Sequence, residues 1–261
     1  ILVRAIYQTR EFEERFLKVG LGYRVLGGTK FYERTEVKDA VAYLRIINQK
    51  YDDLALERVI GSPRRGIGES TLNQLYSFGS QNKLCLEDSI KKNLVTGSLK
   101  PKMKISLTQL TKMLDKWRLD SNTKKHYDLL KIVLDESGYS EMLKNKKDIE
   151  NENRLENIKE LLRAMHDYDD LQSFLEHVAL ATSIDKEWEG EKINLMTMHA
   201  AKGLEFDVVF LPGWEEGLFP HQKSLEEKGD LALEEERRLA YVGITRAKKE
   251  AYLSFAMKRS Y

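Results

Sequence analysis

Cysteine is almost missing from this sequence. Cys85 is the single cysteine among 261 residues, which excludes a disulfide framework within the chain and a zinc finger built on cysteines. No uncharged apolar run approaches the roughly 18 residues that a membrane-spanning helix needs. The opening residues, Ile1-Leu2-Val3-Arg4, lack the basic and apolar regions of a signal peptide. From these absences we expect a cytoplasmic protein that does not enter a membrane.

An initiator methionine is also absent. The apolar and β-branched residues at positions 1–6 indicate a strand that begins without any lead-in. We therefore expect a fragment of a longer chain, in which only part of the function is present.

The residues that are present are typical of a globular protein. Hydrophobic residues make up 41% and charged residues 33% of the chain, which is too apolar a mixture for disorder. At about 150 residues per domain, the length predicts one large domain or two modest ones.

The net charge of +1 conceals an uneven distribution. Residues 1–125 carry 24 Lys and Arg against 14 Asp and Glu, whereas residues 126–261 carry 19 against 28. This asymmetry indicates a polyanion-facing surface on the first half, or two solvated faces that merely differ.

Hydrophobic periodicity divides the chain into three stretches. Strands alternate with helices at both ends, and the middle is nearly all helical apart from a basic, loop-like stretch at 93–104 with Gly97 and Pro101. The expected strands are residues 1–6, 23–26, 193–198, 207–211 and 250–256, and the expected helices beside them are residues 8–19, 35–48 (with Thr35 as N-cap) and 231–243. Such alternation predicts an α/β fold. The simplest architecture is one discontinuous α/β domain, residues 1–50 and 188–261, with an all-α domain, residues 51–187, inserted in it.

A polar turn separates two of the expected strands. Its sequence is Thr197-Met198-His199-Ala200-Ala201-Lys202-Gly203-Leu204-Glu205-Phe206. Turns at strand ends of α/β sheets are where ligands bind, although a solvated loop with one structural glycine would show the same pattern.

A second segment ends the last expected helix. It reads Glu234-Glu235-Glu236-Arg237-Arg238-Leu239-Ala240-Tyr241-Val242-Gly243-Ile244-Thr245-Arg246-Ala247. An arginine fixed just past a helix end can direct its planar guanidinium at a phosphate. Arg246 can equally be a surface salt-bridge partner, for example of Glu236.

These two segments, in this order, resemble motifs V and VI of the UvrD/PcrA/Rep group of superfamily-1 DNA helicases. Other matches follow in family order and spacing over the whole chain. They are Trp214-Glu215-Glu216-Gly217-Leu218-Phe219-Pro220 after motif V, Gln8-Thr9-Arg10 with Glu13 for the Q-S-R-x-x-E element (Thr9 replacing the usual Ser), residues 31–39 for motif IVa, and Arg65-Gly66-Ile67-Gly68 for the G-I-G element.

The resemblance implies a RecA-like parallel-sheet domain of the P-loop NTPase type, with an all-α subdomain inserted in it. It implies the C-terminal portion of an ATP-dependent 3′-to-5′ DNA helicase. Such an enzyme couples ATP hydrolysis to translocation on single-stranded DNA and to duplex unwinding, in DNA repair or replication.

The first half of such an enzyme is not found. The sequence contains no G-x-x-x-x-G-K-[ST], no Asp-Glu box and no Asn-Tyr-Arg element. The resemblance therefore assigns the phosphate loop and the Mg²⁺ ligands to a missing N-terminal RecA-like domain of the same chain, and we expect the fragment alone to be inactive, with no metal site of its own. The segment 132–136 mimics a Walker B strand but lies in a helical stretch.

By resemblance, Arg246 is the catalytic arginine finger on the γ-phosphate of ATP. Glu205 accepts a hydrogen bond from the ribose, and Gly203 permits close approach of the backbone. Gln8 and Arg10 are carried as interdomain or nucleotide-cleft residues.

By the same resemblance, Thr197, His199 and Arg34 contact single-stranded DNA. Leu218 and Phe219 either offer an apolar platform to a base or, for Phe219, pack in the core beside Pro220.

The G-I-G element also has a direct physical interpretation. Gly66 and Gly68, with Ile67 between them, permit a tight turn before a helix that starts near Glu69. The backbone N–H groups of such a turn form an anion-binding nest. Arg64 and Arg65 add positive charge, so the site suits the phosphate backbone of duplex DNA, while a plain helix–turn–helix loop is the alternative. Several lysines either extend this basic surface or lie in a solvated loop: Lys91, Lys92, Lys100, Lys102 and Lys104.

Two other functions stay open. One is a non-catalytic DNA-binding module, and the other is the helicase part of a RecB/AddA-type helicase–nuclease.

Overall fold

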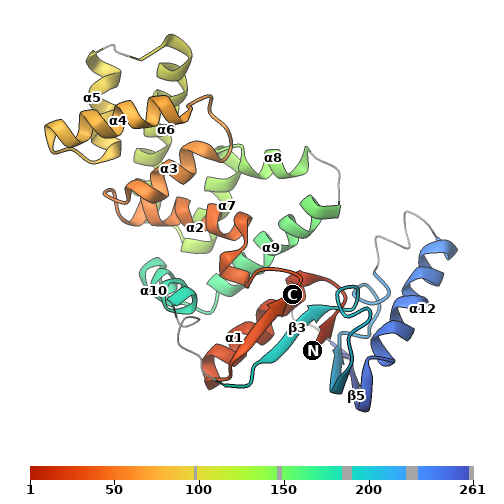
Figure 1. The fold of residues 1–261 in the computed structure, drawn as a ribbon. Helices are drawn as coiled ribbons and strands as arrows, with labels where there is room; N and C mark the ends of the chain where they lie inside the picture. The colour runs from red at the N-terminus through yellow and green to blue at the C-terminus, as the bar shows by residue number, and fades with distance from the viewer. Residues whose placement is uncertain (97–98, 146–148, 184–189, 222–228, 259–261) are drawn as a thin grey trace. The chain divides into compact units, whose positions relative to one another are not determined.

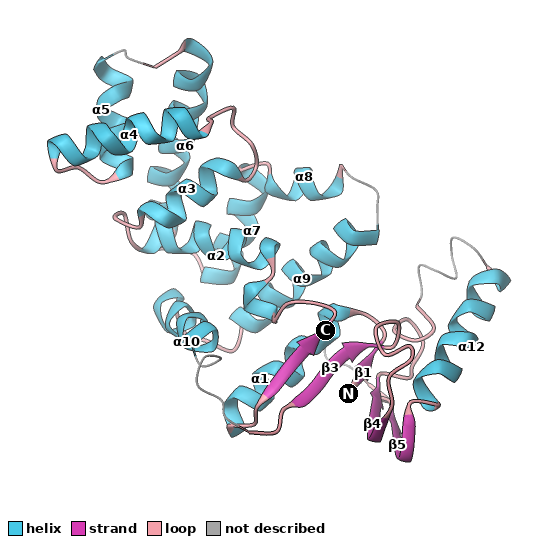
Figure 2. Ribbon diagram, viewed as in Figure 1, coloured by secondary structure: helices cyan, strands magenta, loops and turns pink. Residues whose placement is uncertain are grey.

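A computed structural model describes residues 1–96, 99–145, 149–183, 190–221 and 229–258. Its contacts divide the chain into two compact units, one made of residues 1–31 and 184–261 and the other of residues 32–183. All the strands among the described residues belong to the first unit, and the second is helical (Figure 2). The predicted α/β class with an all-α insert is therefore confirmed.

Parallel strands form the framework of the first unit (Figure 1). Strands β1 (Leu2–Val3), β3 (Ile193–Thr197) and β2 (Tyr23–Leu26) make one sheet in the order β1-β3-β2. Strands β4 (Phe206–Pro212) and β5 (Ala247–Ser254) make a parallel pair in which Phe210 lies opposite Tyr252. The helical elements of this unit are η1 (Ile6–Thr9), α1 (Arg10–Val19) and α12 (Asp230–Ile244).

The core of the first unit gathers residues from β1, β3, β4 and α12. Leu195 and Met196 are adjacent in β3 and both are fully buried, as expected for a parallel strand that is covered on both faces. The buried residues that cluster here are Leu2, Met196, Met198, Ala201, Val209, Leu211, Phe219 and Leu239. Phe219 packs edge-on against Trp214, with ring centroids 5.0 Å apart, so of the two alternatives for Phe219 the structure supports packing in the core.

The first strand is shorter than predicted. Only Leu2 and Val3 pair with β3, and the chain then turns into η1. The side chain of Gln8 accepts a hydrogen bond from the Ala5 N–H at 2.9 Å, and the Gln8 N–H donates to the Ala5 carbonyl at 3.1 Å. This reciprocal cap begins a helical turn where apolar residues alone predicted a strand.

The second unit is a helical array. Its elements are η2 (Phe31–Glu33), which starts at the boundary, and α2 (Thr35–Asn48), α3 (Asp53–Gly61), α4 (Glu69–Asn82), α5 (Leu86–Thr96), α6 (Pro101–Asp120), α7 (His126–Glu136), α8 (Tyr139–Lys144), α9 (Ile149–Met165) and α10 (Leu171–Ser183). The segment 132–136 lies in α7, which confirms that it is helical. Glu136 there accepts a hydrogen bond from the indole of Trp117 at 2.8 Å.

Three aromatic residues centre the core of this unit. Tyr43 packs edge-on against both Trp117 and Tyr139, with ring centroids 5.9 and 6.4 Å apart. The Tyr139 hydroxyl donates to Asp39 at 2.8 Å, and Arg58 pairs with the same carboxylate at 2.7 Å. Burial and the charge of Asp39 raise the pKa of Tyr139, so this hydroxyl stays protonated and keeps donating.

The loop predicted at 93–104 is wrong. Helix α5 continues to Thr96, and Pro101 is the first residue of α6, where its missing N–H would have had no helical partner in any case. Gly97 lies outside the described residues. The helix at 35–48 is found, but Thr35 is its first residue and Arg34 occupies the N-cap position without a side-chain bond.

The division between the units also differs from the predicted boundary at residue 50. Helix α2 belongs to the helical unit, because its apolar face packs on α3, α9 and α10. Periodicity shows that a helix has a buried face but not which partner covers it.

Candidate functional site

The loop between β3 and β4 keeps its apolar residues inside and its polar residues outside. Met198 and Ala201 are buried, whereas Glu205 is exposed and His199 lies at the surface with its ring partly shielded. The Thr197 hydroxyl accepts a hydrogen bond from the Ala200 N–H at 3.2 Å, and this turns the chain directly after β3. Gly203 has φ +84° and open space around its Cα, so a side chain there would be strained.

Arg246 is held entirely by neutral oxygens. Its Nε donates to the Val242 carbonyl at 3.0 Å, one terminal nitrogen donates to the Leu204 carbonyl at 3.1 Å, and the other donates to the Thr245 hydroxyl at 3.0 Å. None of the described carboxylates pairs with it. The alternative of a salt bridge from Arg246 to Glu236 is not found, because Glu236 instead binds Arg4.

These contacts bring the two motif segments together. The Leu204 carbonyl bound by Arg246 lies between Gly203 and Glu205, and the Arg246 carbonyl accepts from the Phe206 N–H at 2.9 Å. Glu205 itself is about half exposed and lies 3.6 Å from Lys248. The structure therefore gathers Gly203, Glu205 and Arg246 at the amino ends of β4 and β5, and their roles toward a nucleotide stay predictions.

Helix α12 packs closely on the same loop. A Cβ built on Gly243 would lie 2.9 Å from the Met198 sulfur and 3.0 Å from a Leu211 methyl. Only glycine permits this approach without movement of its neighbours, so the helix that carries Arg246 at its end is fitted to the loop that carries His199.

His199 and Thr197 lie at the carboxyl end of β3. Partial burial and the positive charge of Arg4 lower the pKa of His199, and Glu236 acts in the opposite direction. The imidazole is therefore neutral at pH 7 and can accept or donate a hydrogen bond. The predicted contact of these two residues with single-stranded DNA stays a prediction.

Gln8 and Arg10 are both engaged in the fold. Gln8 caps η1, and Arg10 is buried and pairs with Glu11. Sequence reasoning gave no role to Glu13, a buried carboxylate that accepts hydrogen bonds from the Thr9 hydroxyl at 2.6 Å and the Phe31 N–H at 2.9 Å. Its position as the glutamate that ends the Q-T-R-x-x-E pattern was the signal that could have identified this role.

The loop before α4 gives the helix no side-chain cap. Gly68 is the N-cap of α4 and, having no side chain, gives the helix no capping bond. The first N–H groups of a helix have no partner within it. Gly66 has φ +74°, Gly68 has φ −94°, and both have open space where a Cβ would be. Because none of the described atoms lies within 4 Å of a Cβ built at Gly68, a ligand has room to approach the backbone there.

Arg65 points inward from this loop. It donates to the Pro63 carbonyl at 2.9 Å and to the Tyr43 hydroxyl at 2.9 Å, and it also contacts the Val59 carbonyl. Its guanidinium thus ties the loop to α2 and the end of α3, and Arg64 is the exposed arginine of the pair. The direct phosphate contact predicted for Arg65 stays a prediction. In this structure the Arg65 side chain stabilises the loop through its hydrogen bonds.

Arg34 is buried in the helical unit. It donates to the Asn157 side chain at 2.6 Å, and Asn157 in turn donates to Glu36. The predicted DNA contact of Arg34 stays a prediction, and in this structure the guanidinium holds the start of α2 to α9.

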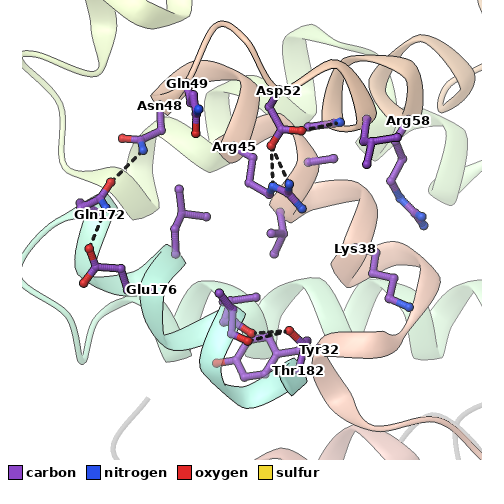
Figure 3. Close-up of a pocket in the computed structure, with 17 residues that line it drawn as sticks. Tyr32, Lys38, Arg45, Asn48, Gln49, Asp52, Arg58, Gln172, Glu176 and Thr182 are labelled. Carbon is purple, nitrogen blue, oxygen red and sulfur yellow. Dashed lines mark hydrogen bonds and ion pairs between the residues drawn. The ribbon is translucent and has the colours of Figure 1, made fainter. Parts of the chain in front are cut away.

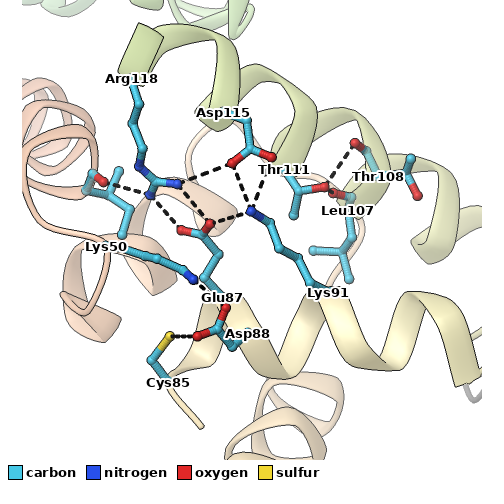
Figure 4. Close-up of polar contacts among 11 residues, drawn as sticks. Lys50, Cys85, Glu87, Asp88, Lys91, Leu107, Thr108, Thr111, Asp115 and Arg118 are labelled. Carbon is cyan, nitrogen blue, oxygen red and sulfur yellow. Dashed lines mark hydrogen bonds and ion pairs between the residues drawn. The ribbon is translucent and has the colours of Figure 1, made fainter. Parts of the chain in front are cut away.

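One of the predicted surface lysines belongs to an internal network (Figure 4). Glu87 is fully buried and is bound by Arg118 at 2.6 Å and by Lys91 at 3.0 Å. Arg118 also donates to the Ile46 carbonyl at 2.9 Å. This network joins α5 and α6 to the end of α2, so Lys91 supports the fold.

A cavity of about 680 Å³ opens between α2, α3 and α10 (Figure 3). Apolar side chains such as Val41 and Leu175 line it, and Asn48 and Gln172 are bonded across it at 2.9 Å. None of the residues predicted to bind nucleotide or DNA lines this cavity. The described residues also contain no cluster of acidic, His or Cys side chains that could hold a metal ion, and none of the described helices is long and apolar enough to cross a membrane.

Comparison with known proteins gives one consistent result. The profile of the UvrD-like helicase C-terminal domain matches residues 1–258. A protein named DNA helicase II from Rickettsia typhi is 47% identical over 261 residues, which cover 99% of this chain and 40% of that protein. The ATP-dependent DNA helicase PcrA of Bacillus subtilis is 42% identical over 273 residues, which cover all of this chain and 36% of that protein. The chain thus spans about 40% or less of the length of these curated relatives.

Proposed function

The chain belongs to the UvrD-like helicase C-terminal domain family, and on this premise we propose that it forms one wall of the ATP site and the DNA-binding helical part of an ATP-dependent DNA helicase. One observation carries the proposal. Arg246 is fixed beside Gly203 and Glu205 by three hydrogen bonds to neutral oxygens, so its positive charge is held in place and is not neutralised.

These side chains fit a nucleoside triphosphate. An unneutralised guanidinium suits a phosphate, and an exposed carboxylate such as Glu205 accepts hydrogen bonds from sugar hydroxyls. ATP supplies the chemistry through cleavage of its terminal phosphoanhydride bond. The phosphate loop and the ligands of Mg²⁺ are expected in the N-terminal RecA-like domain, outside this chain, and the 261 residues alone should not hydrolyse ATP.

Arg246 would act where charge develops during phosphoryl transfer. An arginine finger commonly accelerates such reactions by about 10³–10⁵. Its fork is already oriented by Val242, Leu204 and Thr245, so little reorganisation is needed when a phosphate arrives.

The DNA contacts would lie elsewhere. Thr197 and the neutral His199 offer hydrogen bonds to a single strand at the carboxyl end of β3. The uncapped N-terminus of α4, reached past Gly66 and Gly68, offers backbone N–H groups to the phosphates of a duplex without any base being read.

The experiment is an unwinding assay with the full-length protein. Substrates with a 3′ or a 5′ single-stranded tail are compared, with ATP and Mg²⁺, and ATP turnover is followed with and without single-stranded DNA. The proposal expects turnover that single-stranded DNA stimulates, and unwinding of the 3′-tailed substrate. DNA binding without any turnover would instead support a non-catalytic module, and nuclease cleavage accompanying unwinding would support a helicase–nuclease.

A further inference from the structure

One ion pair in the first unit links parts of the chain that are far apart in sequence. Arg4, directly after β1, binds Glu236 in the middle of α12. The Arg4 Nε lies 3.0 Å from each carboxylate oxygen, and a terminal nitrogen lies 2.7 Å from Oε1. The pair is largely shielded, with 19% of the Arg4 side chain and 6% of the Glu236 side chain exposed.

Arg4 leaves the sheet next to His199. Val3 pairs with Thr197, and the Val3 carbonyl accepts from the Met198 N–H at 2.9 Å. Arg4 follows Val3 directly, and Met198 and then His199 follow Thr197. The charges of Arg4 and Glu236 are also the ones that act on the His199 imidazole.

Helix α12 is then fixed at three points. Glu236 is held by Arg4, Gly243 is in close contact with Met198, and Arg246 beyond the end of the helix binds the Leu204 carbonyl. Met198 and Leu204 lie at opposite ends of the loop that carries His199 and Glu205. Glu236 and Gly243 lie seven positions apart in α12, which is roughly 10 Å at helical rise, so one helix carries both the contact with Arg4 and the contact with this loop.

We propose that Arg4 and Glu236 are positioning residues that hold α12, and with it Arg246, in fixed register with the loop that carries His199. This rests on the proposed function, in which His199 meets single-stranded DNA and Arg246 meets the nucleotide. The ion pair connects His199 with Arg246 through α12, so that DNA bound at His199 changes ATP turnover at Arg246.

Glu236→Gln provides the first test. It keeps the shape of the side chain but removes its charge, which leaves the Arg4 guanidinium shielded and unpaired. The measurement is the ratio of ATP turnover with saturating single-stranded DNA to turnover without DNA, in the full-length protein. We expect this ratio to fall about fivefold or more, the usual lower range for coupling between sites.

A matched control lies on the same helix. Glu234 and Arg237 form an ion pair with 53% and 67% of their side chains exposed, and such pairs contribute little. Glu234→Gln should leave the stimulation ratio as in the wild type.

The pKa of His199 separates positioning from a general loss of structure. It is followed by NMR in full-length protein with ¹³C-labelled histidine, using His199→Gln to assign the signal. Arg4→Gln removes a neighbouring positive charge and should raise the pKa of His199, whereas Glu236→Gln removes a negative charge and should lower it. Local unfolding would expose the ring and raise the pKa in both variants.

Arg4→Lys completes the set, since it keeps the charge but loses the two-pronged geometry. It should leave the His199 pKa near its wild-type value and still reduce the stimulation ratio. The proposal is overturned if Glu236→Gln keeps the wild-type ratio, or if both charge-removing variants shift the His199 pKa upward. A wild-type protein without any DNA-stimulated turnover would instead overturn the proposed function.

Discussion

The site around Arg246 and the loop before α4 both present hydrogen-bond donors, but they are built on different principles. Arg246 is one charged side chain that Leu204, Val242 and Thr245 hold in place. The loop presents backbone N–H groups, and its glycines contribute by having no side chain. The first site should therefore fail when a side chain is removed, and the second when a side chain is added.

The largest effect is expected at Arg246. In the full-length protein, Arg246→Ala should lower the DNA-stimulated kcat by about 10³ or more, while affinity for DNA stays near normal. Arg246→Lys should recover little, because a point charge does not reproduce the planar fork. Steady-state ATP turnover per folded molecule is the measurement.

The neighbouring Lys249 is the control for this variant. It pairs with Asp207 at 2.8 Å in an exposed ion pair, so Lys249→Ala should keep a normal kcat. A lowered melting temperature with normal turnover in Arg246→Ala would mean that the arginine is only structural.

The contact between α12 and the loop can be tested through stability. Gly243→Ala places a Cβ against Met198 and Leu211, and overpacking of this kind costs about 1–3 kcal/mol. The free energy of unfolding is measured in urea. Gly61→Ala is the matched control, because a Cβ built there has nothing within 4 Å. An equal loss of unfolding free energy in both variants would show that the close contact of Gly243 with Met198 and Leu211 is not the cause.

Gly68→Thr sharpens the contrast between the two sites. A threonine at this N-cap position satisfies an N–H group of α4 and should raise stability by a few tenths of a kcal/mol. The same bond occupies a donor that a phosphate would use, so duplex affinity at low salt should fall about tenfold, the equivalent of one charge-assisted hydrogen bond. Unchanged duplex affinity would show that this helix end does not bind phosphate.

The smallest effect concerns Glu205. Glu205→Gln should raise the KM for ATP about fivefold, the loss of roughly one net hydrogen bond, and should leave kcat nearly unchanged. Asp207→Asn, which breaks a similarly exposed pair with Lys249, should change neither constant. If Glu205→Gln and Asp207→Asn have the same KM for ATP, Glu205 does not bind the nucleotide.

The sequence predicts regular elements well where periodicity is strong. Helix α2 is found at Thr35–Asn48 as expected, and β2 at Tyr23–Leu26. The two motif segments are also brought together, because Leu204 and Arg246 are direct hydrogen-bond partners. Local pattern and family resemblance both identify these residues without any knowledge of the tertiary structure.

The choice of partners could not be predicted in this way. Arg4 and Glu236 are 232 residues apart in the sequence, and nothing local indicates that they meet. The carbonyl of Pro63 and the hydroxyl of Tyr43 accept hydrogen bonds from Arg65, and the sequence indicates neither of these partners. A charged residue's sequence position shows that it needs a partner, whereas only the fold shows which one it has.

The independence of the two sites is tested most directly by a paired assay on the same preparations. Arg246→Ala and Gly68→Thr are each measured for DNA-stimulated kcat and for duplex Kd in the full-length protein. We predict that Arg246→Ala loses turnover and keeps duplex affinity, and that Gly68→Thr loses duplex affinity and keeps turnover on single-stranded DNA. Near-normal turnover in Arg246→Ala, or a loss of both properties in either variant, would contradict this account.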